Sequence, residues 1–178
     1  MSDTPDKPAS QIMVAIRKAV RKIRMLIIFI RVGGRLAYGE NSYIAKGWSF
    51  FIPGQGEIGK NVSIGANFIC QTNFRIGDEC LISSNVSFVG NDHDLYHGKS
   101  AYFSGRLPPS TVILEGNNFI GFGAIIVGDV RIGEGAIIAA GAVVINNIPP
   151  NEVYGGVPAR RLKTRPQNSG FNSASNNN

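Results

Sequence analysis

The feature that most constrains this chain is an aliphatic residue at every sixth position through its middle. From Ile58 the sequence reads "IGKNVS", "IGANFI", "CQTNFR", "IGDECL", "ISSNVS" and "FVGNDH". The rhythm resumes at Leu114 with "LEGNNF", "IGFGAI", "IVGDVR", "IGEGAI", "IAAGAV" and "VINNIP". Eleven of these twelve hexads begin with Ile, Leu, Val or Phe. A period of six does not match the helical period of about 3.6, and the many glycines disfavour helices, so the hexads indicate strands.

Each hexad predicts one short strand followed by one tight corner. The leading side chain points into a shared interior, and the Gly, Asn or Asp residues that often follow it tolerate corners with positive φ. Three hexads then close a triangular coil of about 18 residues, and the coils stack about 4.8 Å apart, as strands do in a sheet. By this count residues 58–93 form two coils, residues 114–149 form two more, and residues 41–57 form a degenerate first coil that caps the stack. The prediction is an all-β fold, a parallel β-helix of about five coils.

The two runs of hexads are out of phase with each other. Phe88 and Leu114 lie 26 residues apart, which is not a multiple of six. About twenty residues must therefore leave the coil and return, and we expect a protruding loop at about residues 94–113. A long loop in a solenoid with short corners is usually functional, although a solvated excursion without a role is the alternative.

Four features together resemble one protein family. The repeat is followed by "GNDHD" just before the loop, and a nearly continuous signature runs from Asn117 to Lys163, ending in "YGGVPARRLK". These features resemble the hexapeptide-repeat acyltransferases, most closely the galactoside, maltose and xenobiotic acetyltransferases and the sugar O-acetyltransferases of exopolysaccharide pathways. The resemblance covers about residues 58–163. It implies a left-handed β-helix, acetyl-CoA as co-substrate, and a homotrimer with active sites at its subunit interfaces.

The resemblance places His93 in the position of the family's catalytic histidine. Transfer of an acetyl group from a thioester to a hydroxyl needs a base for the hydroxyl proton, and histidine titrates near working pH. A backbone N–H group would stabilise the oxyanion of the tetrahedral intermediate. We therefore expect direct transfer in a ternary complex, with His93 as general base. Asp92, Asp94 or a backbone carbonyl could orient its ring.

The other histidine, His97, has two interpretations. It could contact the acceptor, or it could be a solvated loop residue. A metal site shared with His93 is not expected, because a helix that would align the two rings is improbable here. The γ-class carbonic anhydrases share the fold but need three histidines, and this chain has two. The predicted acceptor contacts are Asn73, Asp94, Tyr96 and His97.

The same resemblance locates acetyl-CoA along the outside of the C-terminal coils. Ala140 would offer backbone contacts to the pantetheine arm. The family's Thr-Lys pair is replaced here by Ile145 and Asn146, which removes a cation and a hydroxyl at that contact. The nucleotide phosphates would be bound by charge-assisted hydrogen bonds, with plain surface charge as the alternative interpretation. The residues predicted for this role are Arg160, Arg161 and Lys163.

The two ends of the chain differ from its middle. Residues 1–40 form a basic segment in which residues 11–31 predict an amphipathic helix. This helix either packs on the base of the β-helix or on a neighbouring subunit, or lies in an anionic membrane interface. Residues 41–163 form the β-helix domain, and the polar residues 164–178 are predicted to be disordered.

Charge and cysteine content narrow the setting. Residues 41–150 carry six Lys or Arg against eight Asp or Glu, which argues against a nucleic-acid surface along the body. Cys70 and Cys80 are expected to be reduced and buried, as in a cytosolic protein. No signal peptide is evident, and the apolar run "MLIIFI" is far shorter than the roughly 20 residues that span a bilayer. We therefore expect a cytoplasmic protein, with a peripheral location at the inner face of the membrane as the alternative.

Taken together, the sequence predicts an acetyl-CoA-dependent sugar O-acetyltransferase of exopolysaccharide, capsule or lipopolysaccharide biosynthesis. Its acceptor would be a free or a lipid-linked sugar, and no metal is expected. The alternatives are an N-acetyltransferase of an amino-sugar nucleotide, a serine or xenobiotic acetyltransferase, and a non-catalytic hexapeptide scaffold. A serine acetyltransferase is disfavoured because that family has a larger helical N-terminal domain. The intact "NDHD" before a long loop argues against the scaffold.

Overall fold

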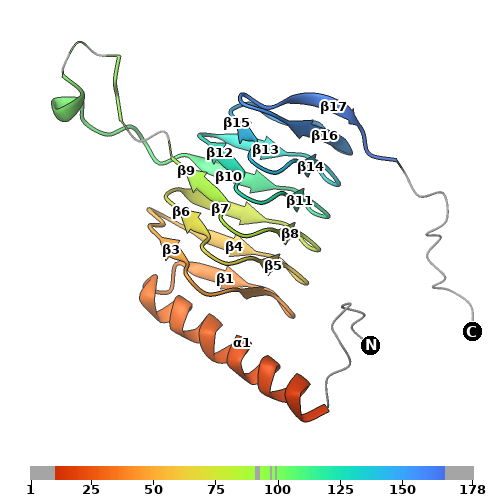
Figure 1. The fold of residues 1–178 in the computed structure, drawn as a ribbon. Helices are drawn as coiled ribbons and strands as arrows, with labels where there is room; N and C mark the ends of the chain where they lie inside the picture. Colours follow the sequence, from red (N-terminus) through yellow and green to blue (C-terminus); the bar gives the residue numbers. More distant parts are fainter. Residues whose placement is uncertain (1–10, 91–92, 97, 99, 167–178) are drawn as a thin grey trace, which may run out of the picture.

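The structure is a computed structural model that describes residues 11–90, 93–96, 98 and 100–166. One helix lies across the end of a stack of short parallel strands (Figure 1). The elements are α1 Gln11–Arg31, β1 Leu36–Tyr38, β2 Tyr43–Ile44, β3 Ser49–Phe50, β4 Gly56–Ile58, β5 Ser63–Ile64, β6 Ile69–Cys70, β7 Asn73–Ile76, β8 Leu81–Ile82, β9 Ser87–Val89, the 3₁₀ turn η1 Ala101–Phe103, β10 Thr111–Leu114, β11 Phe119–Ile120, β12 Ile125–Val127, β13 Val130–Ile132, β14 Ile137–Ile138, β15 Val143–Val144, β16 Glu152–Gly155 and β17 Arg160–Thr164.

The strands form three sheets that run along the stack. The first contains β1, β4, β7, β10 and β13, the second contains β2, β5, β8, β11, β14, β16 and β17, and the third contains β3, β6, β9, β12 and β15. Each strand from β1 to β13 therefore pairs with the third strand after it, and three strands make one coil. The predicted left-handed parallel β-helix is confirmed, with five complete coils before β16. Ile58 pairs with Ile76, 18 residues further on, as the repeat requires.

The interior consists of two sets of side chains from every coil. All twelve leading residues of the hexads are buried. The residue two positions before each lead is also buried, because side chains i and i+2 share one face of a strand. Asn118 is the one polar residue in this second set, which otherwise contains Val, Phe, Ala and Cys. Its Nδ2 donates to the carbonyl oxygens of Gly133, at 2.7 Å, and Ala136, at 3.2 Å, so the buried amide is satisfied.

The corners explain why each hexad has the composition it has. The fourth residue of a hexad repeatedly adopts a left-handed conformation, with φ of 56° at Asn61, 60° at Asn85 and 68° at Gly123. Asn and Gly tolerate this conformation better than other residues, as the sequence predicted. The second residue is often glycine because the next coil passes very close to it. A Cβ atom on Gly121 would lie 2.5 Å from the backbone nitrogen of Ala140.

The ordered domain extends past both of its predicted boundaries. The first coil begins at Leu36 and pairs in register with Gly56, so it starts before residue 41. Its residues diverge so far from the hexad pattern that the sequence alone gave a later start. At the other end, β17 runs to Thr164, and Arg165 donates to the carbonyl oxygens of Asn117 and Gly135. The predicted tail beyond residue 166 lies outside the described residues.

The protruding loop joins β9 to β10 and leaves the stack as a narrow arm (Figure 1). Asn73 pairs with Thr111, 38 residues further on, so the insertion adds twenty residues to the usual 18. The prediction of a departure of about twenty residues is confirmed. The placement of His93 on the rigid coil is wrong, because the chain has already left the coil after Val89. Gly, Asn and Asp serve a tight corner and the start of a loop equally well, so the last hexad could not distinguish them.

Candidate functional site

Two pockets lie along one corner of the triangular stack. This corner carries the chain from the third sheet back to the first, and the protruding loop is its insertion in the third coil. The lower pocket, of about 390 Å³, is lined by Phe51, Pro53, Gln71, Gly90, Arg106, Leu107, Pro109 and Ser110. The upper pocket, of about 320 Å³, is lined by Val144, Ile145, Asn146, Asn147, Ile148, Tyr154, Ala159, Arg160 and Arg161. Only the corner of the fourth coil, between β12 and β13, separates the two.

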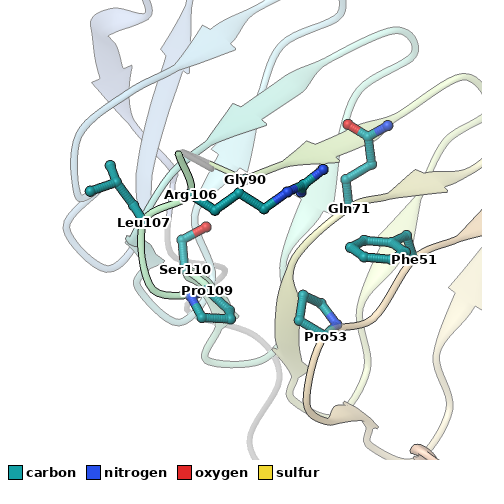
Figure 2. A pocket seen from close by; sticks show the side chains of 8 residues that line it. All are labelled: Phe51, Pro53, Gln71, Gly90, Arg106, Leu107, Pro109 and Ser110. Atoms are coloured by element: carbon teal, nitrogen blue, oxygen red, sulfur yellow. The ribbon is translucent and has the colours of Figure 1, made fainter. Parts of the chain in front are cut away.

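The lower pocket combines an apolar wall with hydrogen-bonding side chains. Figure 2 shows the Arg106 side chain extending from the loop toward Gln71, with Phe51 and Pro53 on the facing wall. The Phe51 side chain is 62% exposed, which leaves its ring free to contact a ligand. An open aromatic ring with a guanidinium and an amide beside it suits a polar ligand that has apolar faces.

His93 stands beside this pocket at the stem of the loop. It forms an isolated antiparallel bridge with Arg106. Side chains directly opposite in an antiparallel pair project to the same face, with Cβ atoms about 5 Å apart. Because Arg106 lines the lower pocket, the exposed His93 side chain lies at the margin of that pocket. The backbone pairing supplies the positional restraint that the coil itself does not.

A buried hydroxyl contacts the His93 ring. Ser104 Oγ lies 3.5 Å from His93 Nδ1 and donates to the carbonyl oxygen of Ala101 at 2.9 Å. Since a serine hydroxyl has one proton, its oxygen is left to accept from Nδ1–H. This arrangement favours the tautomer with a lone pair on Nε2, which is the form that a general base needs. Sequence reasoning missed Ser104, because nothing distinguishes it from the other serines of the loop.

The return of the loop to the coil is fixed by two buried hydroxyl residues. Thr72 Oγ1 donates to the carbonyl oxygen of Ser110 and lies 2.8 Å from Ser110 Oγ. The backbone N–H of Thr111 then donates to Asp129 Oδ1 at 2.6 Å. These contacts anchor the pocket wall that Ser110 forms. The sequence pattern singles out neither Thr72 nor Ser110.

The predicted acceptor residues do not gather in one place. Asn73 Oδ1 accepts from the backbone N–H groups of Gly54, at 2.8 Å, and Gln55, at 3.2 Å, which gives Asn73 a role in holding a corner. Asp94 is half-buried next to His93 in the loop stem, and Tyr96 is 97% exposed. None of these three lines the lower pocket. His97, like Asp92, lies outside the described residues, and the acceptor contacts stay predictions.

The predicted cofactor residues are brought together in part. Asn146, Arg160 and Arg161 all line the upper pocket, whereas Ala140 and Lys163 are exposed outside it. Arg161 Nε lies 2.8 Å from Glu152 Oε2, so its charge is partly neutralised. Arg160 donates to the Ala159 carbonyl oxygen, and within the described part of the chain no carboxylate pairs with it. Arg160 is therefore the cation most available to an anionic ligand.

The two thiols are buried, as the sequence predicted. Burial raises the pKa of Cys70 to about 12 and that of Cys80 to about 11, since a thiolate is poorly solvated in the interior. Both side chains therefore remain protonated near neutral pH and are unsuited to nucleophilic catalysis. The residues that the structure describes contain no group of three or more His, Cys, Asp or Glu placed to hold a metal ion.

Comparison with known proteins identifies the repeat and the fold. The family described as "Bacterial transferase hexapeptide (six repeats)" matches residues 111–146. Galactoside O-acetyltransferase of Escherichia coli is 31% identical over 133 residues, which cover 70% of this chain and 62% of that protein. The chain thus spans less than two thirds of the length of this relative.

Two solved structures extend the likeness to ligand complexes. An N-acyltransferase from Bacillus cereus, in complex with dTDP and 3-hydroxybutyryl-CoA, has a TM-score of 0.65 and 26% identity, covering 75% of this chain and 74% of its own. A galactoside acetyltransferase in complex with coenzyme A has a TM-score of 0.63 and 29% identity, covering 72% of this chain and 64% of its own.

Proposed function

Because the chain belongs to the hexapeptide-repeat acyltransferases of left-handed β-helix fold, we propose that it transfers an acetyl group from acetyl-CoA to a sugar hydroxyl. The galactoside O-acetyltransferase relative supports oxygen as the acceptor atom. The product would enter exopolysaccharide, capsule or lipopolysaccharide biosynthesis.

The observation that carries this proposal is the position of the two pockets on one corner of the stack. Arg160 in the upper pocket offers a cation for the phosphates of coenzyme A. His93 and the acceptor pocket lie at the same corner, with one coil between. An acetyl-CoA molecule that follows the corner would bring its thioester toward His93 while its nucleotide stays near Arg160.

The chemistry needs no covalent enzyme intermediate. The sugar hydroxyl oxygen attacks the thioester carbonyl carbon while His93 Nε2 accepts the hydroxyl proton. The tetrahedral intermediate collapses, the carbon–sulfur bond breaks, and the departing thiolate takes the proton back from the imidazolium. The products are an O-acetyl sugar and free coenzyme A. Ser104 favours the tautomer of His93 that can begin this sequence.

The lower pocket fits a sugar better than an amino acid. The exposed Phe51 ring can stack on the apolar face of a pyranose, while Gln71 and Arg106 can bind its hydroxyl groups. We place the acceptor here, next to the loop residues Asp94, Tyr96 and His97. A neighbouring subunit of a homotrimer would cover this corner and close the groove.

A second acceptor class is favoured by one relative. The Bacillus cereus neighbour is an N-acyltransferase whose complex contains dTDP. The guanidinium of Arg106 could bind the diphosphate of a nucleotide-linked amino sugar, and the same base would serve an amine. O- and N-transfer therefore differ only in the acceptor atom.

We predict that His93→Ala lowers turnover about 10²–10⁴-fold while the protein stays folded, because the general base is lost. Free coenzyme A would be measured with a thiol reagent during a screen of acetyl-CoA against sugars, nucleotide-linked amino sugars and serine. His97→Ala is the matched control and is expected to change at most the KM for the acceptor. Near-wild-type turnover of His93→Ala, or a loss confined to His97→Ala, would remove His93 as the base. Failure of every acceptor would favour a non-catalytic scaffold.

A further inference from the structure

The outer face of α1 is a stripe of exposed apolar side chains. Residues separated by three or four positions lie on one face of a helix. The members of this stripe are Ile16, Val20, Ile23, Ile27 and Ile30, whose exposed fractions run from 44% to 66%. Such a contiguous apolar surface on a soluble protein marks a place where something binds.

The helix is held to the β-helix by its opposite face. Met25 and Ile28 are its buried apolar residues, and at about 100° per residue Met25 lies roughly opposite Ile16 and Ile27. Arg24 Nη1 donates to the carbonyl oxygen of Ile44 at 3.3 Å. The Arg21 guanidinium lies 4.0 Å from the centre of the Tyr43 ring. The apolar stripe therefore plays no part in attaching α1, contrary to the expectation that an amphipathic helix buries its apolar face in its own domain.

The charge of α1 is of one sign. Residues Gln11–Arg31 contain six Lys or Arg and no Asp or Glu. Lys18 and Lys22 are exposed on one flank of the stripe, and Arg31 is exposed on the other. An apolar face bordered by basic residues is the arrangement of a helix that lies in a membrane interface. Among the described residues no helix is long and apolar enough to cross a bilayer, so the helix would lie on the surface.

The position of α1 leaves its outer face accessible. The helix crosses the N-terminal end of the stack, and the coils rise from its inner side toward β17 at the far end (Figure 1). A planar surface could therefore approach the stripe without meeting the protruding loop or the upper pocket. A second copy of the chain is a poorer partner, because two α1 helices would bring twelve cations together without a carboxylate.

We propose that α1 docks this protein on an anionic lipid bilayer, with the stripe inserted among the headgroups and the flanking Lys and Arg residues bound to lipid phosphates. The proposal does not depend on the acceptor or on the reaction. It would hold the catalytic corner upright above the membrane, where a lipid-linked acceptor would be within reach.

The test is co-sedimentation of the full chain with vesicles of phosphatidylcholine, with and without phosphatidylglycerol. We expect binding only with phosphatidylglycerol, weakening as salt rises. The double variant Ile23→Asp, Ile27→Asp should stay in the supernatant. Lys18→Gln with Lys22→Gln should weaken partitioning about thirtyfold, at roughly 1 kcal/mol for each basic residue near an anionic surface. Lys46→Gln with Lys60→Gln removes the same charge from exposed corners of the β-helix and should have little effect.

Two further measurements separate this proposal from its rivals. Circular dichroism and solution mass should show that the Ile23→Asp, Ile27→Asp variant keeps its fold and its oligomeric state, with unchanged turnover on a soluble acceptor. A smaller solution mass for this variant would mean that the stripe pairs copies of the chain, and membrane docking would be abandoned. Absence of binding to either vesicle, or equal binding by both lysine double variants, would overturn it as well.

Discussion

At the scale of single residues, the site depends on how one imidazole is held. His93 is fixed in the loop stem by its backbone bridge to Arg106, and Ser104 contacts the nitrogen that does not act as the base. The 3.5 Å separation is long for a hydrogen bond, and catalytic contacts often tighten only when substrates bind. Ser104 is thus a positioning residue whose effect should grow in the ternary complex.

We predict that Ser104→Ala lowers kcat about tenfold, because one hydrogen bond worth about 1 kcal/mol no longer selects the His93 tautomer. The KM for acetyl-CoA should be unchanged, and the pH profile of kcat should shift. Ser104→Thr keeps a hydroxyl and should restore most of the rate. A Ser104→Ala variant with a wild-type pH profile, or an equal loss in Ser104→Thr, would mean that the serine only packs the loop.

At the scale of the elements, the corners decide whether the coils can stack. The second and fourth residues of a hexad have different requirements. Gly121 must lack a side chain because the next coil passes close to it, whereas Gly123 adopts a φ of 68° with open space around its Cα. Asn61 and Asn85 occupy the same place as Gly123 in their own hexads. One glycine is thus required by contact and the other by backbone conformation.

Two substitutions in the same corner should therefore differ in their effects. Gly121→Ala would place a Cβ atom 2.5 Å from the backbone nitrogen of Ala140, and we expect it to lower the free energy of unfolding by about 1–3 kcal/mol. Gly123→Asn should cost less than about 1 kcal/mol, because Asn tolerates the left-handed region. Thermal and denaturant unfolding would measure both. Equal destabilisation by the two variants would show that contact between coils is not the constraint at Gly121.

At the scale of the whole molecule, the stack turns one corner into an extended groove with separate tasks at its two ends. The upper pocket offers positive charge, and the lower pocket offers a base with a polar and aromatic surface. α1 closes the stack at the end away from β17. Binding of the donor, chemistry on the acceptor and attachment to a surface would therefore occupy different coils.

This division predicts different kinetic effects at the two pockets. Arg160→Ala should raise the KM for acetyl-CoA about tenfold or more with little change in kcat, since a charge-assisted hydrogen bond contributes about 1.5–3 kcal/mol. Arg161→Ala should have a smaller effect, because that residue is already paired with Glu152. The matched control is Lys60→Ala, which removes an exposed cation at the other end of the stack. An equal rise in KM for Lys60→Ala would indicate a general effect of net charge.

Much of the architecture could be predicted from the sequence, because the repeat states the same local rule many times. A lead at every sixth position identified the interior, and the phase difference between Phe88 and Leu114 identified the length of the insertion. The first coil escaped this reasoning because its 20-residue spacing, from Leu36 to Gly56, departs from the repeat. Its start could be found only from the strand pairing.

The site shows where such reasoning ends. The sequence by itself determined the β-helix, the existence of the loop and the choice of His93, since these depend on local periodicity and on motifs. Only the tertiary structure placed Ser104 against His93, made Phe51 and Arg106 face one pocket, and left Arg160 without the carboxylate that Arg161 has. It also turned the apolar stripe of α1 outward. These features depend on contacts between distant coils and on which face of an element packs, and neither is encoded in the spacing of residues along the chain.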